Sequence, residues 1–98
     1  MTITKNVNGN DLVIALEGRL DTMTAPELEA ELNKSMGDAE TLTLDFSKLD
    51  YISSAGLRVL LSAHKVMLRK GGMKVTNVNE IVQEVFEVTG FADLLNIE

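Results

Sequence analysis

The alternation of apolar and polar residues at the start of the chain predicts a β-hairpin. Residues 2–7 and 11–17 are both typical of strands. The turn between them, Asn8-Gly9-Asn10, contains an Asn-Gly pair, which favours the positive φ angles of a tight turn. We therefore expect an antiparallel pair of strands at one side of a sheet.

Helical periodicity follows the hairpin. Apolar residues recur every four positions, at Leu28, Leu32 and Met36. This spacing predicts a helix over about 25–36 that packs along one face. Thr24 and Glu27 have the spacing of a capping box, and Pro26 is tolerated because amides of the first turn have no intrahelical acceptor.

The rest of the chain alternates between strand and helix patterns. The expected elements are a buried strand over 41–46, a helix over 54–70, a strand over 73–78, a helix over 80–89 and a short helical turn over 91–95. Asn79 is expected to cap the 80–89 helix and Gly90 to end it. The pattern indicates an α/β fold with a mixed, largely parallel sheet of four to five strands and about four helices.

Composition narrows the range of functions. A chain of 98 residues can bury one modest core, so we expect a single domain over residues 1–98. There is no cysteine and one histidine, His64, which excludes disulfides, thiolate metal sites and any site that needs two imidazoles. We expect neither a metal nor a cofactor.

Charge and hydropathy exclude further classes of partner. The formal net charge of −6 argues against nucleic acid, because phosphate binding relies on clustered Lys and Arg. No apolar run approaches the ~20 residues of a membrane span, and the N-terminus lacks the pattern of a secretory signal. We expect a cytoplasmic protein that contacts neither nucleic acid nor membrane.

Two adjacent hydroxyls, on Ser53 and Ser54, lie where a loop should become the 54–70 helix. Ser53 suits the N-cap position, with its side-chain oxygen accepting from amides of the first turn, which leaves Ser54 at or beside the first helical position. The free amides and the helix dipole favour an anion there, by roughly 0.3 to 1 kcal/mol at an exposed site. The residues alone leave two interpretations open, a phosphate acceptor or a simple helix cap.

Other polar residues could gather around these serines. Ligands in open α/β sheets bind outside the carboxyl ends of the strands, and Asp21, Asp45 and Ser47 are each expected near such an end. Asp21 either orients the Ser54 hydroxyl or positions a partner, or it simply begins an Asx turn.

A basic stripe follows the second expected helix. The residues at helical spacing on its exposed side are Ser54, Arg58, Ser62, Lys65 and Arg69. Arg58 lies one turn from Ser54, where it could pair with a phosphate or meet an acidic patch on a partner. The alternative is a solvated helix face whose late cations suit the negative helix end.

Catalysis is not expected. Ser62 and Lys65 form a Ser-x-x-Lys pattern, but it lies inside a helix and lacks the companion motifs of a serine acylase. His64 lies nearly three helical turns from Ser54, beyond hydrogen-bond reach. A small hydrolase that used Ser54 with Asp21 would therefore lack a base.

Three segments carry a resemblance to a known family. They are residues 18–21 (GRLD), 42–47 (LTLDFS) and 51–61 (YISSAGLRVLL). In order and spacing they resemble the anti-sigma factor antagonists, the single-domain members of the STAS group (sulphate transporter and anti-sigma factor antagonist). The likeness spans nearly the whole chain and implies a STAS-type fold.

The resemblance implies a binding protein rather than an enzyme. Such an antagonist binds an anti-sigma factor, typically a serine protein kinase with an ATP-binding fold, and so releases a sigma factor. The kinase phosphorylates a serine that matches Ser54, a serine phosphatase reverses the reaction, and the family's loop aspartate matches Asp21. The residues expected to bind the partner are Asp21, Ser53, Ser54, Gly56 and Arg58, with the backbone at Gly56 open to close approach.

This chain departs from the family pattern on both sides of Ser54. Many members have Asp before the phosphorylated serine and Ser or Thr after it, whereas this chain has Ser53 and Ala55. Ser53 thus brings a second hydroxyl to the site. The alternative function is a constitutive STAS subunit of another regulatory or transport assembly, in which Ser54 is never phosphorylated.

Overall fold

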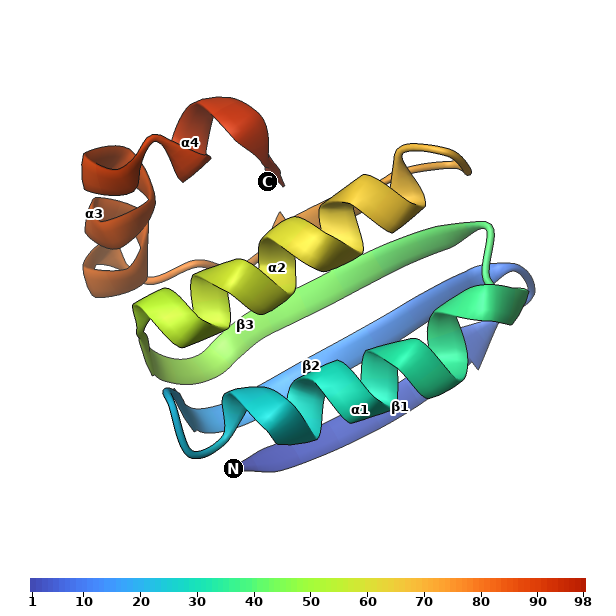
Figure 1. Ribbon diagram of the computed structural model, residues 1–98, viewed down its shortest axis with the longest axis horizontal. Coiled ribbons are helices and arrows are strands. Elements are labelled where there is room, and N and C mark those ends of the chain that lie inside the picture. The colour runs from blue at the N-terminus through green and yellow to red at the C-terminus, as the bar shows by residue number, and fades with distance from the viewer.

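Two long helices, α1 (Ala25–Ser35) and α2 (Ser54–Met67), lie on a five-stranded sheet and run roughly along its strands in the computed structural model, which describes residues 1–98 (Figure 1). The strands pair in sequence order: β1 (Thr2–Asn8), β2 (Asp11–Leu20), β3 (Thr41–Ile52), β4 (Met73–Thr76) and β5 (Asn96–Ile97). The other helical elements are a 3-10 turn η1 (Met36–Asp38), α3 (Glu80–Thr89) and α4 (Phe91–Leu94). Only β1 and β2 are antiparallel, which confirms the expected hairpin and mixed sheet.

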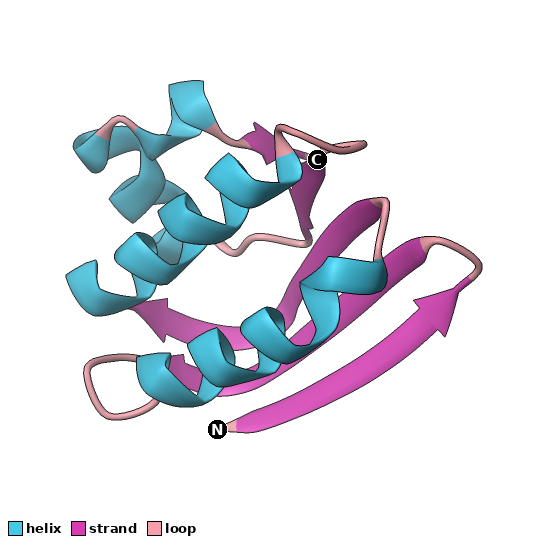
Figure 2. Ribbon diagram, turned by 45° about the vertical axis from the view of Figure 1, so that its right-hand side comes forward, coloured by secondary structure: helices cyan, strands magenta, loops and turns pink.

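The core lies between the sheet and the two long helices. In β2 the buried residues Leu12, Ile14 and Leu16 alternate with the half-buried Val13 and Ala15, so one face of this strand meets the core. Figure 2 shows α1 and α2 on the same side of the strands. Their buried side chains are Ala25, Leu28 and Leu32 from α1, and Leu57, Val59, Leu60, Ala63 and Met67 from α2. Each fully buried Leu contributes about 1.5–3 kcal/mol to folding.

The third strand is longer than predicted. The sequence suggested a strand over 41–46, but β3 continues to Ile52 because β2 extends beside it to Leu20. The pairing continues past two register shifts, and the second follows Gly18, whose φ of +108° is rarely open to residues with a side chain. The prediction of a short strand was wrong because these bulges hide the pairing from the hydrophobic pattern.

Helix α3 forms where the sequence placed it. α3 spans Glu80–Thr89, the side chain of Asn79 accepts a hydrogen bond of 2.8 Å from the Val82 amide, and Gly90 ends the helix with a φ of 85°.

Two other elements differ from the prediction. α2 ends at Met67, three residues earlier than expected. The two-residue strand β5 was not predicted, because it is too short to show a period.

No helix of the structure combines the length and the hydropathy that a membrane crossing requires. No three His, Asp or Glu side chains come together as the ligands of a metal ion would.

Candidate functional site at the start of α2

The loop that begins at Asp21 and the turn into α2 lie at the same edge of the sheet. β2 and β3 run parallel and end together, with Leu20 paired to Ile52. The Ser53 amide donates a hydrogen bond of 2.9 Å to the Leu20 carbonyl oxygen. Asp21 and Ser53 are therefore neighbours at this edge, as the sequence predicted.

Ser53 does not cap α2 with its side chain. Its backbone occupies the N-cap position, with φ −99° and ψ 176°, but its hydroxyl accepts no hydrogen bond from the helix. The Ser53 Oγ atom is buried and has no partner. The prediction of a serine cap is correct for the backbone and wrong for the side chain.

Ser54 is the exposed member of the pair. It is the first residue of α2, and the first helical hydrogen bond runs from the Leu57 amide to the Ser53 carbonyl over 3.0 Å. The amides of Ser54, Ala55 and Gly56 precede that bond and lack an intrahelical acceptor. The accessible Ser54 hydroxyl thus lies at the positive end of the α2 dipole, where the Ser53 side chain does not cap the helix.

The Asp21 carboxylate is fixed within its own loop. Its Oδ1 atom accepts hydrogen bonds from the amides of Met23 (3.0 Å) and Thr24 (3.1 Å), which is an Asx turn. The pKa of Asp21 lies below its ordinary value of 3.8, mainly because the carboxylate accepts the hydrogen bond from the Thr24 amide. Partial burial opposes this shift, whereas the Met23 amide, the Thr24 hydroxyl and the positive charge of Arg19 add to it. No hydrogen bond joins Asp21 to Ser54, so the carboxylate brings a fixed negative charge rather than orienting the hydroxyl.

The expected capping box of α1 does not form. Thr24 is the N-cap residue, but its side chain makes no bond to the helix. Instead, Thr24 Oγ1 accepts from the Asp21 amide over 2.9 Å and donates to the Arg19 carbonyl over 2.7 Å. The Thr24 hydroxyl thus stabilises the loop that carries Asp21, at the expense of the cap.

Arg19 is a site residue that the sequence analysis missed. Its Nε atom lies 3.8 Å from Asp21 Oδ2, and its guanidinium carbon lies 4.5 Å from the centroid of the Tyr51 ring. Arg19 and Tyr51 are paired across β2 and β3, so the contact was predictable only with the full extent of both strands.

Met23 was also missed, because a single apolar residue in a polar loop shows no pattern. Its side chain is 83% exposed between Asp21 and Thr24. The Asx turn holds the Met23 backbone amide in place, and the loop presents the apolar Met23 side chain to solvent.

Gly56 faces the core rather than solvent. A Cβ atom on Gly56 would lie 2.7 Å from Leu20 Cγ and 2.9 Å from Ile52 Cγ1, both closer than carbon atoms can pack. The expectation that the backbone is open to a partner at Gly56 is wrong, because the protein's own side chains occupy that space. Glycine is needed here so that α2 can approach the ends of β2 and β3.

Asp45 and Ser47 do not join the site. Asp45 lies seven residues before the end of β3, which is roughly 20 Å along a strand at about 3.3 Å per residue. Its Oδ1 atom accepts hydrogen bonds from the Asn77 side chain and from the Ser47 amide, each over 3.0 Å. These bonds lower the pKa of Asp45, and the bond from Asn77 has the larger effect.

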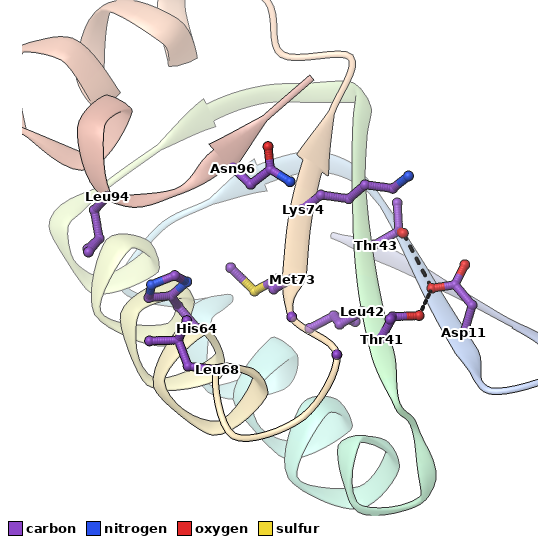
Figure 3. Close-up of a pocket in the computed structure, with 12 residues that line it drawn as sticks. Asp11, Thr41, Leu42, Thr43, His64, Leu68, Met73, Lys74, Leu94 and Asn96 are labelled. Atoms are coloured by element: carbon purple, nitrogen blue, oxygen red, sulfur yellow. Dashed lines mark hydrogen bonds between the residues drawn. The ribbon is translucent and has the colours of Figure 1, made fainter.

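A pocket of about 440 Å³ lies elsewhere, near the C-terminal end of α2 (Figure 3). Its lining includes His64, Leu68, Met73 and Leu94, and also Asp11, which accepts hydrogen bonds from two threonines, Thr41 (2.7 Å) and Thr43 (3.5 Å). His64 is half buried, as expected for a side chain at the edge of the core, and its Nδ1 atom has no partner. None of the expected partner-binding residues lines this pocket.

Ser54 has no base within hydrogen-bond reach. The carboxylate oxygen of Asp21 that accepts bonds serves its own loop, and His64 lies ten residues further along α2, about 15 Å at 1.5 Å per residue. The fold and the site together define a small α/β protein that presents one accessible serine at a helix N-terminus, beside a fixed carboxylate.

The sequence profile of the STAS domain matches residues 2–98, and the chain belongs to the STAS domain family. BtrV of Bordetella bronchiseptica is 35% identical over 99 residues, covering 99% of this chain and 85% of BtrV. The anti-sigma-B factor antagonist of Bacillus subtilis is 29% identical over 91 residues, covering 92% of this chain and 84% of that protein.

Solved structures confirm the STAS-type fold. An anti-sigma factor antagonist from Mycobacterium paratuberculosis matches with a TM-score of 0.90 at 22% identity, covering 98% of this chain and 83% of that one. The Bacillus cell fate determinant SpoIIAA in its phosphorylated form matches with a TM-score of 0.76 at 20% identity, covering 99% of this chain and 91% of that one.

Proposed function

We propose that this protein is an anti-sigma factor antagonist that is switched off by phosphorylation of Ser54. It binds an anti-sigma factor that is a serine kinase with an ATP-binding fold, acts in the cytoplasm, and thereby releases a sigma factor. The relatives from Bacillus subtilis and Mycobacterium paratuberculosis carry the antagonist name, which supports this role.

The observation that carries the proposal is the contrast between the two serines. Ser54 is exposed at the first position of α2, whereas the Ser53 Oγ atom is buried. A kinase must reach the hydroxyl that it modifies, so burial removes Ser53 as a competing acceptor. SpoIIAA, which shares the fold, has been solved in a phosphorylated form.

Charge explains how phosphorylation would stop binding. A phosphate adds about −1.5 to −2 charges at neutral pH, and the uncapped amides of α2 stabilise it locally. The Asp21 carboxylate, kept ionised by its loop, already contributes one negative charge at the same edge. After modification, a partner that fits the unmodified surface would have to desolvate the phosphate and the Asp21 carboxylate, or would be repelled by their negative charges.

The proposed partner surface comprises Asp21, Ser54 and Arg58, with Met23 as an apolar contact. Arg58 is exposed one turn after Ser54 and has no carboxylate within ion-pair distance, so it is free to contact the partner or the phosphate. Ser53 and Gly56 support this surface from beneath, because both are held against Leu20. A serine phosphatase would restore the binding form.

Binding and modification can be tested with the purified chain and each anti-sigma kinase of its host. Calorimetry measures affinity, and mass spectrometry after incubation with Mg-ATP locates phosphate. We expect wild type to bind and to gain one phosphate on Ser54, Ser54→Ala to bind without gaining phosphate, and Ser54→Asp to bind at least about tenfold more weakly because of the added charge. Ser62→Ala is the matched control, since Ser62 is exposed on the same face of α2.

Three results would contradict parts of the proposal. Phosphate on Ser53 would overturn the acceptor assignment, and equal affinity of wild type and Ser54→Asp would overturn the charge mechanism. Stable binding to a partner, together with no phosphorylated form of the protein in cells under any growth condition, would instead identify a constitutive STAS subunit.

A further inference from the structure

Positive charge is concentrated in one part of this acidic protein. Between Asp50 and Glu80 the chain has no Asp or Glu, although it has 15 of them in total, and it has five of its nine Lys and Arg residues there. Those five residues are Arg58, Lys65, Arg69, Lys70 and Lys74. This segment is thus strongly basic within a chain of net charge −6.

Two of the five cations have partners inside the protein. Lys70 donates hydrogen bonds to three carbonyl oxygens, those of Met36 (2.7 Å), Gly37 (2.9 Å) and Ala39 (2.9 Å). Lys74 lies 3.8 Å from a carboxylate oxygen of Glu98. The positive charges of Lys70 and Lys74 are therefore already paired with groups of this protein.

The other three cations form what we call the basic face of α2: Arg58 and Lys65 on the helix, and Arg69 two residues beyond its last residue, Met67. All three are exposed, and none of their side chains makes an ion pair with a carboxylate or a hydrogen bond within the protein. They follow Ser54 at helical spacing, so the basic face begins one turn after the candidate phosphorylation site. Within α2 it extends about 17 Å from Ser54 to Lys65 at 1.5 Å per residue, and Arg69 continues it just beyond the end of the helix.

A shallow hollow with one apolar lining residue lies at the far end of the basic face. Its volume is about 430 Å³, it is lined by Lys65, Val66, Arg69 and Lys70, and Val66 is 42% exposed. A partner segment that suits this hollow has one apolar side chain to cover Val66 and carboxylates to meet the flanking cations.

We propose that the basic face of α2 binds an acidic, amphipathic segment of the anti-sigma factor, so that the interface runs along the whole helix instead of ending at Ser54. This inference rests on the proposed function and specifies the chemistry of the partner. Unpaired cations in a chain rich in carboxylates are complementary to an acidic surface, and they steer such a partner to its docking site. Phosphate on Ser54 would then compete with the partner's carboxylates for Arg58.

Nucleic acid and anionic membrane fit these observations less well. Three exposed cations are few for a phosphate backbone, and the remaining surface of a chain with net charge −6 would repel a polyanion. The three cations of the basic face are enough to bind an acidic protein segment that is a few helical turns long.

The test is a charge reversal at the far end of the face, away from Ser54. Lys65→Glu combined with Arg69→Glu is compared with Lys34→Glu combined with Lys48→Glu, which makes the same charge change at two exposed lysines on α1 and β3. Calorimetry uses the purified anti-sigma kinases of the host. We expect the first variant to bind about tenfold or more weakly at low salt, with a smaller difference at high salt, and the control to stay within about twofold of wild type.

Amine labelling of the wild-type complex gives a second measurement that needs no variant. Lys65 should be protected from labelling in the complex, and Lys34 and Lys48 should not. Circular dichroism confirms that each variant is folded. Equal binding by both double variants, or full labelling of Lys65 in the complex, overturns the inference and leaves the proposed function standing.

Two other outcomes separate the proposals. If no anti-sigma kinase binds wild type, the proposed function fails and this inference fails with it. If wild type binds duplex DNA, RNA or anionic vesicles at physiological salt and the Lys65→Glu, Arg69→Glu variant does not, the basic face is a polyanion site and the inference is wrong.

Discussion

The amide of Ser53 donates a hydrogen bond of 2.9 Å to the carbonyl of Leu20. This bond joins the residue before Ser54 to the residue before Asp21, although the two lie far apart in the sequence. The candidate serine and the fixed carboxylate therefore belong to one rigid edge of the sheet. Their relative position is set by strand pairing and does not depend on a flexible loop.

Gly56→Ala should lower the free energy of unfolding by about 1–3 kcal/mol, the usual cost of overpacking a core. The new methyl group would meet Leu20 Cγ at 2.7 Å, and Leu20 is fully buried and cannot move aside. The better helix propensity of Ala, about 1 kcal/mol, offsets only part of this cost. Urea denaturation measures the difference.

Gly37→Ala is the matched control for that substitution. A Cβ atom at Gly37 would meet nothing within 4 Å, so this variant should be as stable as wild type or more stable, by up to about 1 kcal/mol. A Gly56→Ala protein as stable as Gly37→Ala would show that α2 can shift away from the sheet.

Ser53→Ala and Asn79→Ala should differ, although both residues occupy N-cap positions. The Asn79 side chain accepts from the Val82 amide and donates to the Leu49 carbonyl, each over 2.8 Å, so its loss should cost about 1 kcal/mol or more. The Ser53 hydroxyl has no partner, so its removal should change stability by less than about 0.5 kcal/mol. A large loss for Ser53→Ala in thermal unfolding would mean that the hydroxyl does cap α2.

These two caps show what local sequence patterns can predict. The ends of α3 follow from Asn79 and Gly90 alone, because both act within one helical turn. The Ser53 rotamer depends on packing at the junction of β2, β3 and α2, which only tertiary structure defines. The bulges near Gly18, the Arg19–Tyr51 contact and the burial of Gly56 were missed for the same reason, since each joins residues distant in the chain.

Stability at acid pH should depend on Asp21. Its pKa is lowered in the folded protein, so its contribution to stability is complete above its ordinary value of 3.8 and is lost as pH falls through the lower folded value. Asp21→Asn keeps an oxygen for the Asx turn but cannot titrate. The free energy of unfolding of this variant should therefore fall less steeply between about pH 5 and pH 2 than that of wild type.

The control for the acid experiment is Asp50→Asn, since Asp50 is exposed and makes no hydrogen bond or ion pair. Part of the wild-type slope should remain in both variants, because the pKa of Asp45 is also lowered. Identical slopes for Asp21→Asn and Asp50→Asn would contradict the role given to the Asp21 loop.

Lys70→Met should destabilise the protein by about 1–3 kcal/mol, because three carbonyl oxygens lose a charged donor. Arg69→Met, at the preceding position, removes a cation whose side chain has no partner in the fold and should change stability by less than about 0.5 kcal/mol. Chemical denaturation of the two variants distinguishes them, and equal stabilities would show that the Lys70 bonds contribute little.

Helix α2 is anchored at both ends. Gly56 leaves no space between its first turn and the residues Leu20 and Ile52, and Lys70, just beyond its last turn, is bound to the carbonyls that follow α1. Because both ends are held, we expect a charge added at Ser54 to leave the position of α2 unchanged. Phosphorylation of Ser54 would then change the electrostatic potential of the surface that a partner contacts, without a rearrangement of the core.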